Sequence, residues 1–291
     1  MTNQSHLPRT LLRARRDLLW LLVWIGGLII VGAWDFAFLN QPALARLSRA
    51  VLNTLFVGTF VVCVSCLMGW LSGITLHALS EARNTFLYYV LTFLFNLIRS
   101  IPQIVGVLIG YVVLTLLIRA DVLRSELSQL IWMGSVISVF VFLEISDLVR
   151  ERIQHFKNLD FVDAMLCCGI KESRIVNVDI LFKNSRAHLL HKMISVFGIT
   201  IFLLCSIDFI VSVGLSTDVS LSNFPMTLGG LLAKLDSKQD ILAISSAFTD
   251  FGSIGALFFE HLQGVSTAFI IVFTLICIYN ISNAFVKRHR L

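Results

Sequence analysis

Charged side chains are scarce in this sequence. Lysine, arginine, aspartate and glutamate make up 14% of the 291 residues, whereas hydrophobic residues make up 57%. Soluble domains ordinarily carry about 25% charged residues, so a water-soluble globule of this composition could not cover its own core. Lipid must therefore surround much of the surface. Because backbone polar groups in lipid have to be satisfied within the chain, the fold is either helical or a closed barrel.

The sequence also lacks the alternation of apolar and polar residues that marks the strands of a membrane barrel. Its apolar stretches are nearly continuous, as in residues 18–38 and 265–281, and are long enough for helices that span a bilayer. The fold class is therefore predicted to be all-α, a polytopic integral membrane protein. No small-residue cleavage site follows the first stretch, so we interpret it as a membrane anchor and not as a secretory signal.

No arrangement typical of a catalytic or metal site is present. The six cysteines lie in apolar runs or as the adjacent pair Cys167 and Cys168, without histidines at ligand spacing, and we interpret them as packing residues. The closest histidines, His188 and His191, have no clustered acids beside them. There is also no Gly-x-x-x-x-Gly-Lys-Ser/Thr loop to hold nucleotide phosphates. We therefore expect no enzyme, no metal and no cofactor bound by this chain.

Six candidate spans follow from apolar length and flanking polar residues. They cover residues 18–38, 51–76, 101–118, 127–145, 194–215 and 265–285. An even number of spans places both termini on one side. With both termini inside, 17 of the 23 lysines and arginines fall on inside segments, which predicts that the termini are cytoplasmic. The net charge of +5 follows from this topology and from anionic lipids, and requires no nucleic acid.

One apolar stretch is too long for a single straight crossing. Residues 85–118 would form a helix of about 51 Å, against a hydrocarbon core of about 30 Å. The expected interruption is Arg99-Ser100-Ile101-Pro102, since proline removes a backbone donor and restricts the residue before it. We expect an interfacial or re-entrant helix to end there, with the break facing the bundle interior. The alternative is one long tilted helix with a proline kink.

The longest segment predicted to be cytoplasmic, residues 150–192, has the pattern of two short helices. Asp160 and Asp163 resemble a capping box, and Gly169 stands where a left-handed residue would end the first helix. A second helix is expected from Lys171. Its apolar residues are Ile175, Val176 and Ile180. The pattern predicts a helix-turn-helix outside the membrane, although amphipathic helices lying on the bilayer surface would have the same pattern.

This segment resembles the cytoplasmic signature loop of the permease subunits of binding-protein-dependent ABC importers. The family pattern is Glu-Ala-Ala, three residues, Gly, nine residues, Ile, any residue, Leu-Pro. Ala164, Gly169 and Leu181 match that pattern, and Asp163 replaces its glutamate conservatively. The departures from it are Met165, Asp179 and Phe182. The match falls between the fourth and fifth predicted spans, on the side that the charge count places in the cytoplasm.

Other stretches resemble the same family, closest to the dipeptide and oligopeptide permeases of the C type. They are residues 53–55, the run from Gly69 to Gly73, residues 96–103, residues 226–232 and the tail from 280 to 290. The resemblance covers about residues 50–290, which we interpret as the permease domain with its coupling loop near residues 158–182. Residues 1–49 would hold a basic cytoplasmic tail, the first transmembrane helix and a short external loop.

The resemblance implies a type I ABC importer permease fold with six transmembrane helices, in a bacterial plasma (inner) membrane. It implies a translocation pathway for peptides or a similar small solute, driven by ATP that separate ATPase subunits use. The expected contacts with that ATPase are Asp163, Ala164, Gly169 and Leu181. Further expected partners are an external substrate-binding protein, received on residues 216–264, and a second permease, for which we favour a heterodimer over a homodimer.

Polar residues within the apolar segments are candidates for the translocation pathway, because burying them in a membrane is costly. They are Asn96, Arg99, Gln103 and Asp208. A structural ion pair or an interfacial position is the alternative for Asp208. The residues Asp35, His77, Glu144 and Asp147 stand at predicted span ends and are interpreted as interfacial charge. A secondary, ATP-independent transporter is the competing function, and it predicts an inverted internal repeat that this sequence does not show.

Overall fold

The computed structural model describes residues 15–81, 85–214, 224–234 and 262–289. Within these ranges the chain forms helices and no strand. The helices are α2 (Arg16–Phe38), α3 (Gln41–Glu81), α4 (Thr85–Ser100), α5 (Gln103–Arg119), α6 (Glu126–Lys157), α7 (Asp160–Cys167), α8 (Glu172–Arg174), the π-helix η1 (Ile175–Asn184), α9 (Arg186–Gly214), α10 (Leu228–Lys234) and α13 (Leu262–His289). The all-α prediction is confirmed for these residues.

Five described helices, α2, α3, α6, α9 and α13, are long and apolar enough to cross a bilayer. The α4–α5 pair supplies a sixth crossing if it is taken as one broken span. The chain is therefore a multi-pass helical membrane protein. With 41 residues α3 is about 61 Å long, and with 32 residues α6 is about 48 Å long. Both exceed the hydrocarbon core of about 30 Å, so each must project beyond it.

The break between α4 and α5 lies where the sequence predicts it. α4 ends at Ser100, α5 begins at Gln103, and the two helices are bent by 90°. Pro102 is the N-cap residue of α5, so the alternative of one long tilted helix is wrong. The expectation that the break faces the bundle interior is also wrong for this chain, since Ser100 and Pro102 are exposed. The physical reason is that α4 lies at the edge of the bundle, and none of residues 86–100 is buried.

The centre of the bundle is the pair α3 and α6, which pack against each other extensively. Gly69 and Gly73, one turn apart on α3, face Ile145 and Val149 of α6. A Cβ added at Gly69 would lie 2.6 Å from the Cβ of Ile145, and one at Gly73 would lie 2.6 Å from a methyl carbon of Val149. The two glycines therefore permit the close approach of these helices, as small residues do in membrane bundles.

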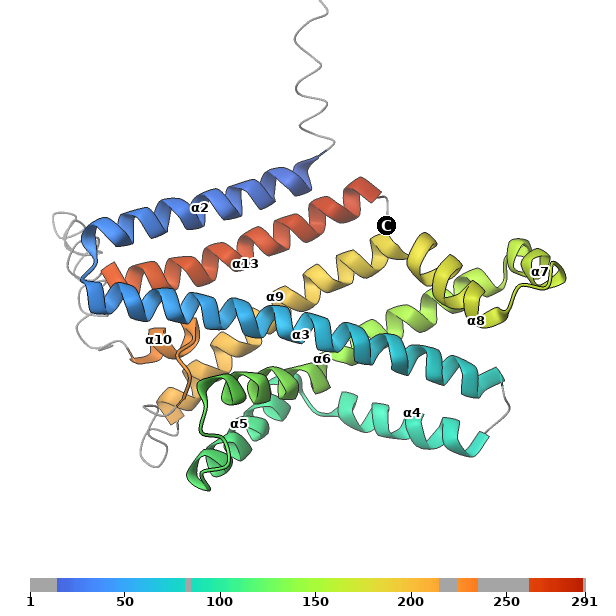
Figure 1. Cartoon of the computed structure of the whole chain (residues 1–291), viewed down its shortest axis with the longest axis horizontal. Coiled ribbons are helices and arrows are strands. Elements are labelled where there is room, and N and C mark those ends of the chain that lie inside the picture. Colours follow the sequence, from blue (N-terminus) through green and yellow to red (C-terminus); the bar gives the residue numbers. More distant parts are fainter. Residues whose placement is uncertain (1–14, 82–84, 215–223, 235–261, 290–291) are drawn as a thin grey trace, which may run out of the picture.

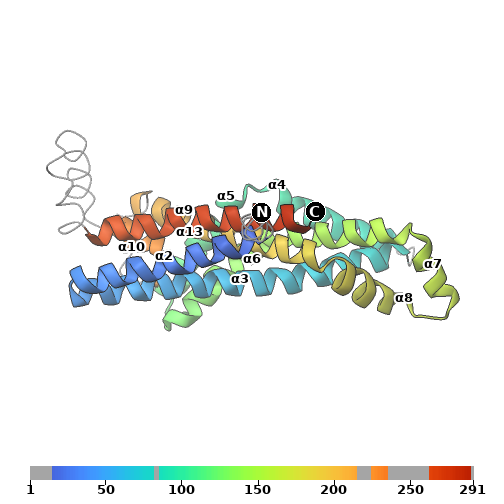
Figure 2. The same ribbon diagram turned by 90° about the horizontal axis from the view of Figure 1, so that it is seen from above.

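The first and last described helices, α2 and α13, form a second pair along one flank (Figures 1 and 2). At one end of the pair the Ser266 hydroxyl donates to Asp35 Oδ1 at 2.5 Å. At the other end Arg288 Nη1 donates to Asp17 Oδ2 at 2.8 Å. Asp35 is only 1% exposed, so its interpretation as interfacial charge is wrong, because it joins two helices inside the protein.

Figure 1 shows the start of α2 and the end of α13 pointing toward the half of the molecule that carries α7 and α8. The turn from α2 to α3 and the short helix α10 lie in the opposite half (Figure 1). This arrangement agrees with an even number of crossings. Within the predicted external segment, residues 216–223 and 235–261 lie outside the described residues, so most of the expected docking face for a binding protein is outside them too.

Candidate functional site

A helical elbow follows α6 at one end of the bundle (Figures 1 and 2). It consists of α7, α8 and η1, and we call residues 160–184 the elbow. α7 begins at Asp160 as predicted, but its N-cap residue is Leu159 and no side chain caps it. The capping-box interpretation is therefore wrong. Asp160 and Asp163 lie instead in the first turn of α7, where negative charge is favourable beside the positive end of the helix dipole.

Gly169 ends the first helix of the elbow in the predicted left-handed conformation, with φ +77°. Its N–H donates to the carbonyl of Leu166 at 2.9 Å, and the N–H of Ile170 donates to the carbonyl of Met165 at 3.1 Å. These two bonds make a Schellman motif, in which a left-handed residue allows the last carbonyls of a helix to be satisfied. The direction of the chain after α7 is therefore set by Gly169.

The second helix of the elbow is wider than the sequence predicts. Only Glu172–Arg174 is α-helical, and the chain continues as a π-helix over Ile175–Asn184. π-helical geometry is rare and occurs frequently at functional sites. The predicted apolar face is confirmed, because Ile175, Val176 and Ile180 are buried.

The four residues expected to contact an ATPase do not lie on one surface. Asp163, Ala164 and Gly169 are exposed. Leu181 has 0% exposure, so it supports the elbow from inside and is no surface contact. On the opposite face of α7, Val162 is buried in the hydrophobic core. One face of the elbow is therefore packed against the rest of the protein, and the opposite face is exposed.

Polar contacts fix the elbow to α3 and α6. Trp70 Nε1 donates to Asn177 Oδ1 at 3.1 Å, and Arg152 Nε donates at 3.2 Å to Oγ of Ser185, the residue that follows the elbow. His77 Nε2 of α3 lies 3.6 Å from Glu172 Oε1, beyond hydrogen-bond distance. We call the supporting parts of the two long helices, residues 69–81 of α3 and 145–157 of α6, the stalk. Because buried side chains and polar pairs both join the elbow to the stalk, the two are expected to move as one body.

Two of the pathway candidates lie together beside α6. Arg99 donates to both carboxylate oxygens of Asp147, at 2.8 and 2.7 Å. The Gln103 amide lies 3.4 Å from Glu144 Oε1, and Lys192 Nζ lies 2.8 Å from Glu144 Oε2. A row of polar contacts therefore runs from the α4–α5 break across α6 to α9.

The acids in this row, Glu144 and Asp147, were not expected to have partners on other helices. The bases that pair with them are Arg99 of α4 and Lys192 of α9, and not Arg150 or Arg152, which are nearer in the sequence. The signal that could have found these pairs is an acid and a base at the same depth in two predicted segments. Choosing between neighbouring bases requires the packing of the helices, which the sequence does not give.

The other two pathway candidates, Asn96 and Asp208, lie apart. Asn96 is exposed on α4. Asp208 is 7% exposed and accepts a hydrogen bond from Thr227 Oγ1, which itself accepts from the N–H of Gly230 at 3.1 Å. Asp208 thus joins α9 to the segment of α10, in the half of the molecule away from the elbow (Figure 1).

Comparison with known proteins adds no family assignment. No protein-family model matches the sequence, and no curated protein matches it. The functional conclusion therefore depends on the geometry described above and on the motif residues themselves.

Proposed function

We propose that this chain is the membrane-spanning permease subunit of a binding-protein-dependent ABC importer in a bacterial plasma membrane. Together with a second, different permease it forms the pathway for peptides or a similar small solute. Separate ATPase subunits supply the energy. Both termini and the elbow lie in the cytoplasm, and a substrate-binding protein docks on the opposite side.

The observation that carries this proposal is the firmly held elbow with an exposed outer face. Val162, Ile175 and Leu181 are buried against the protein, while Asp163 and Ala164 remain exposed. Amphipathic helices lying on a bilayer would instead use their apolar face for lipid. The elbow is anchored to its own bundle by its buried apolar residues, while Leu166, Val178 and Phe182 remain exposed on it. Such an elbow suits a protein partner that contacts the exposed face and moves the stalk as a rigid body.

The row of polar contacts beside the break between α4 and α5 supports a pathway at the edge of this chain. The ion pair of Arg99 and Asp147 is half exposed, with 51% and 52% of the two side chains accessible. Charged groups at membrane depth ordinarily face water or protein and not lipid. A second permease that packs beside α4 would place this row in an interior position between the two subunits.

Chemical cross-linking from the elbow tests the proposal. Ala164→Cys is introduced with Cys167→Ser and Cys168→Ser, and a short photoactivatable thiol reagent is applied in native membranes. The expected result is a cross-link to a subunit that mass spectrometry identifies as an ABC ATPase. The matched control is Arg124→Cys in the same background, which lies between α5 and α6 at the other end and has a side chain 75% exposed.

The control variant should give no cross-link to the ATPase. ATP-independent uptake by the purified chain alone, with no ATPase captured at residue 164, would reject the proposal and support the secondary transporter. Purified complex that contains an ATPase and takes up solute only with ATP would support the importer.

A further inference from the structure

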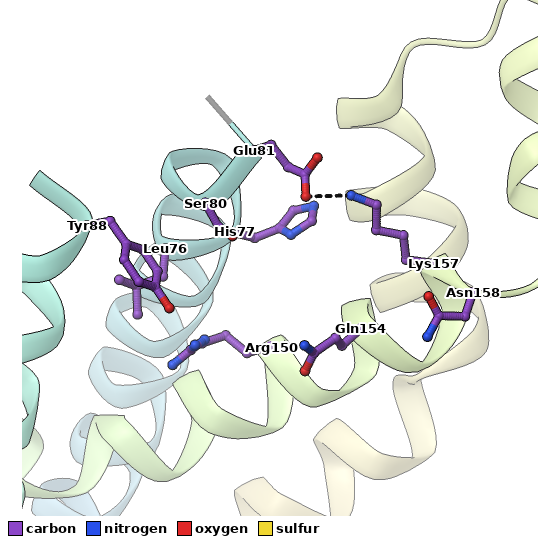
Figure 3. A pocket seen from close by; sticks show the side chains of 9 residues that line it. All are labelled: Leu76, His77, Ser80, Glu81, Tyr88, Arg150, Gln154, Lys157 and Asn158. Carbon is purple, nitrogen blue, oxygen red and sulfur yellow. Dashed lines mark ion pairs between the residues drawn. The ribbon is translucent and has the colours of Figure 1, made fainter. Parts of the chain in front are cut away.

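A polar cavity of about 300 Å³ lies between the ends of α3 and α6 and the start of α4 (Figure 3). Its lining includes the hydrogen-bond donors Ser80, Tyr88, Arg150, Gln154 and Asn158. Figure 3 shows these side chains gathered around one space from three separate helices. A volume of this size is at the lower end of the range for small-ligand sites, and it suits one small polar group.

The charge of the cavity is positive. Lys157 Nζ pairs with Glu81 Oε1 at 2.6 Å, so these two lining charges compensate each other. Arg150 has no acid within ion-pair distance among the described residues, and Glu81 is the acid in the lining. Arg150 also lies seven residues before the end of α6, which is too far from the last turn for its guanidinium to hydrogen-bond the unpaired carbonyls there. One positive charge therefore remains for a ligand.

His77 also belongs to the lining of the cavity. His77 Nε2 is buried and has no hydrogen-bond partner within the described part of the chain, since Glu172 Oε1 lies 3.6 Å away. An unsatisfied buried nitrogen is costly unless a ligand or water completes it. The Arg150 guanidinium and the neutral donors of the lining would satisfy the oxygens of a phosphate group.

The position of the cavity relative to the apolar spans identifies the source of the phosphate. The apolar part of α6 ends near Ile145, and Arg150 follows about 7.5 Å further along the axis. The polar layer on each side of a bilayer is about 5–8 Å thick, so Arg150 lies at the depth of lipid phosphates.

We propose that this cavity binds the phosphate of an anionic membrane phospholipid, with the headgroup between α3, α4 and α6. The site depends on the membrane-spanning character of the chain and not on an ATPase partner. Basic pockets between transmembrane helices are suited to anionic headgroups. A lipid held there also lies against His77, the α3 residue that faces the elbow.

The test uses the purified full chain in vesicles of phosphatidylglycerol and phosphatidylcholine. Native mass spectrometry measures how many phosphatidylglycerol molecules stay bound. Arg150→Gln should weaken retention about tenfold or more, because a charge-assisted contact to phosphate is lost. The matched control, Arg174→Gln, removes the same charge from an exposed position on the elbow and should leave retention unchanged.

Equal retention in the Arg150→Gln and Arg174→Gln variants would overturn the proposal. Release of bound phosphatidylglycerol by millimolar inorganic phosphate, with phosphate itself retained, would identify a free-phosphate site and overturn the lipid assignment. If Arg150→Gln does not fold, the double variant Ser80→Ala with Tyr88→Phe removes two donors at little change in volume. Wild-type retention in that folded variant would also reject the site.

Discussion

Gly169 is the residue on which the shape of the elbow depends most directly. Its φ of +77° is a conformation that L side chains rarely adopt, while a Cβ at this position would meet no atom within 4 Å. Any substitution is therefore opposed by the backbone and not by crowding. Valine and asparagine separate these effects, because asparagine tolerates the left-handed region far better than a β-branched residue does.

Gly169→Val is expected to destabilise the local fold of the elbow by about 1–2 kcal/mol, since the valine opposes the left-handed conformation that ends α7. Limited trypsin digestion at the exposed residues Lys171 and Arg174 measures this opening. Cleavage should become roughly tenfold faster in the valine variant, because local opening governs cleavage. Gly169→Asn should be cleaved more slowly than the valine variant. Equal cleavage of both variants and the wild type would show that the left-handed turn is dispensable.

Residues determined by their neighbours in sequence were predictable, and residues determined by distant partners were not. Gly169 follows from the local end of a helix, and its conformation is as predicted. Asp35 was misread as interfacial because its partner Ser266 lies 231 residues away in the chain. Leu181 matches a family motif, but packing of the elbow onto α6 buries it completely. Pattern alone cannot separate a surface contact from a core residue of the same motif.

The helices show the same division between local and distant causes. Pro102 makes the break between α4 and α5 predictable, because its effect is confined to its own backbone and the preceding residue. The 90° bend and the full length of α3, Gln41–Glu81, were not predictable. Apolar length measures only the part of a helix that lies in lipid. The polar ends of α3 are stabilised by contacts such as that of Glu81 with Lys157 of α6.

The α3–α6 pair gives a test of the stalk. Gly69→Val should destabilise the protein by about 1–3 kcal/mol, because the added side chain meets Ile145 and the backbone carbonyl of Phe142. Thermal unfolding in detergent measures the loss. Gly32→Val in α2 is the matched control, since a Cβ there has no atom within 4 Å. The control shares the lower helix propensity of valine but not the clash. Equal melting temperatures for the two variants would mean that α3 and α6 do not approach closely at this position.

The whole molecule is an elongated bundle in which the flanking pair α2 and α13 lies beside the central pair (Figures 1 and 2). The stalk projects past the apolar spans and carries the elbow at its far end, as the lengths of α3 and α6 require. A force applied to the elbow would therefore act at the end of a lever formed by two closely packed helices. Such a lever is useful to an importer only if the elbow lies in the cytoplasm, where ATP is available.

The exposed thiols of Cys167 and Cys168 at the end of α7 make this orientation measurable without new cysteines. A charged, membrane-impermeant maleimide should label the elbow in inverted vesicles and not in right-side-out vesicles, because the reagent cannot cross the bilayer. The Cys167→Ser, Cys168→Ser variant should lose the signal, which separates the elbow from Cys63 and Cys66 within the apolar part of α3. Labelling from the outside would place the elbow where no cytoplasmic ATPase can bind. The importer proposal would then fail, whereas the phospholipid site would remain tenable, since lipid phosphates lie at the same depth in both leaflets.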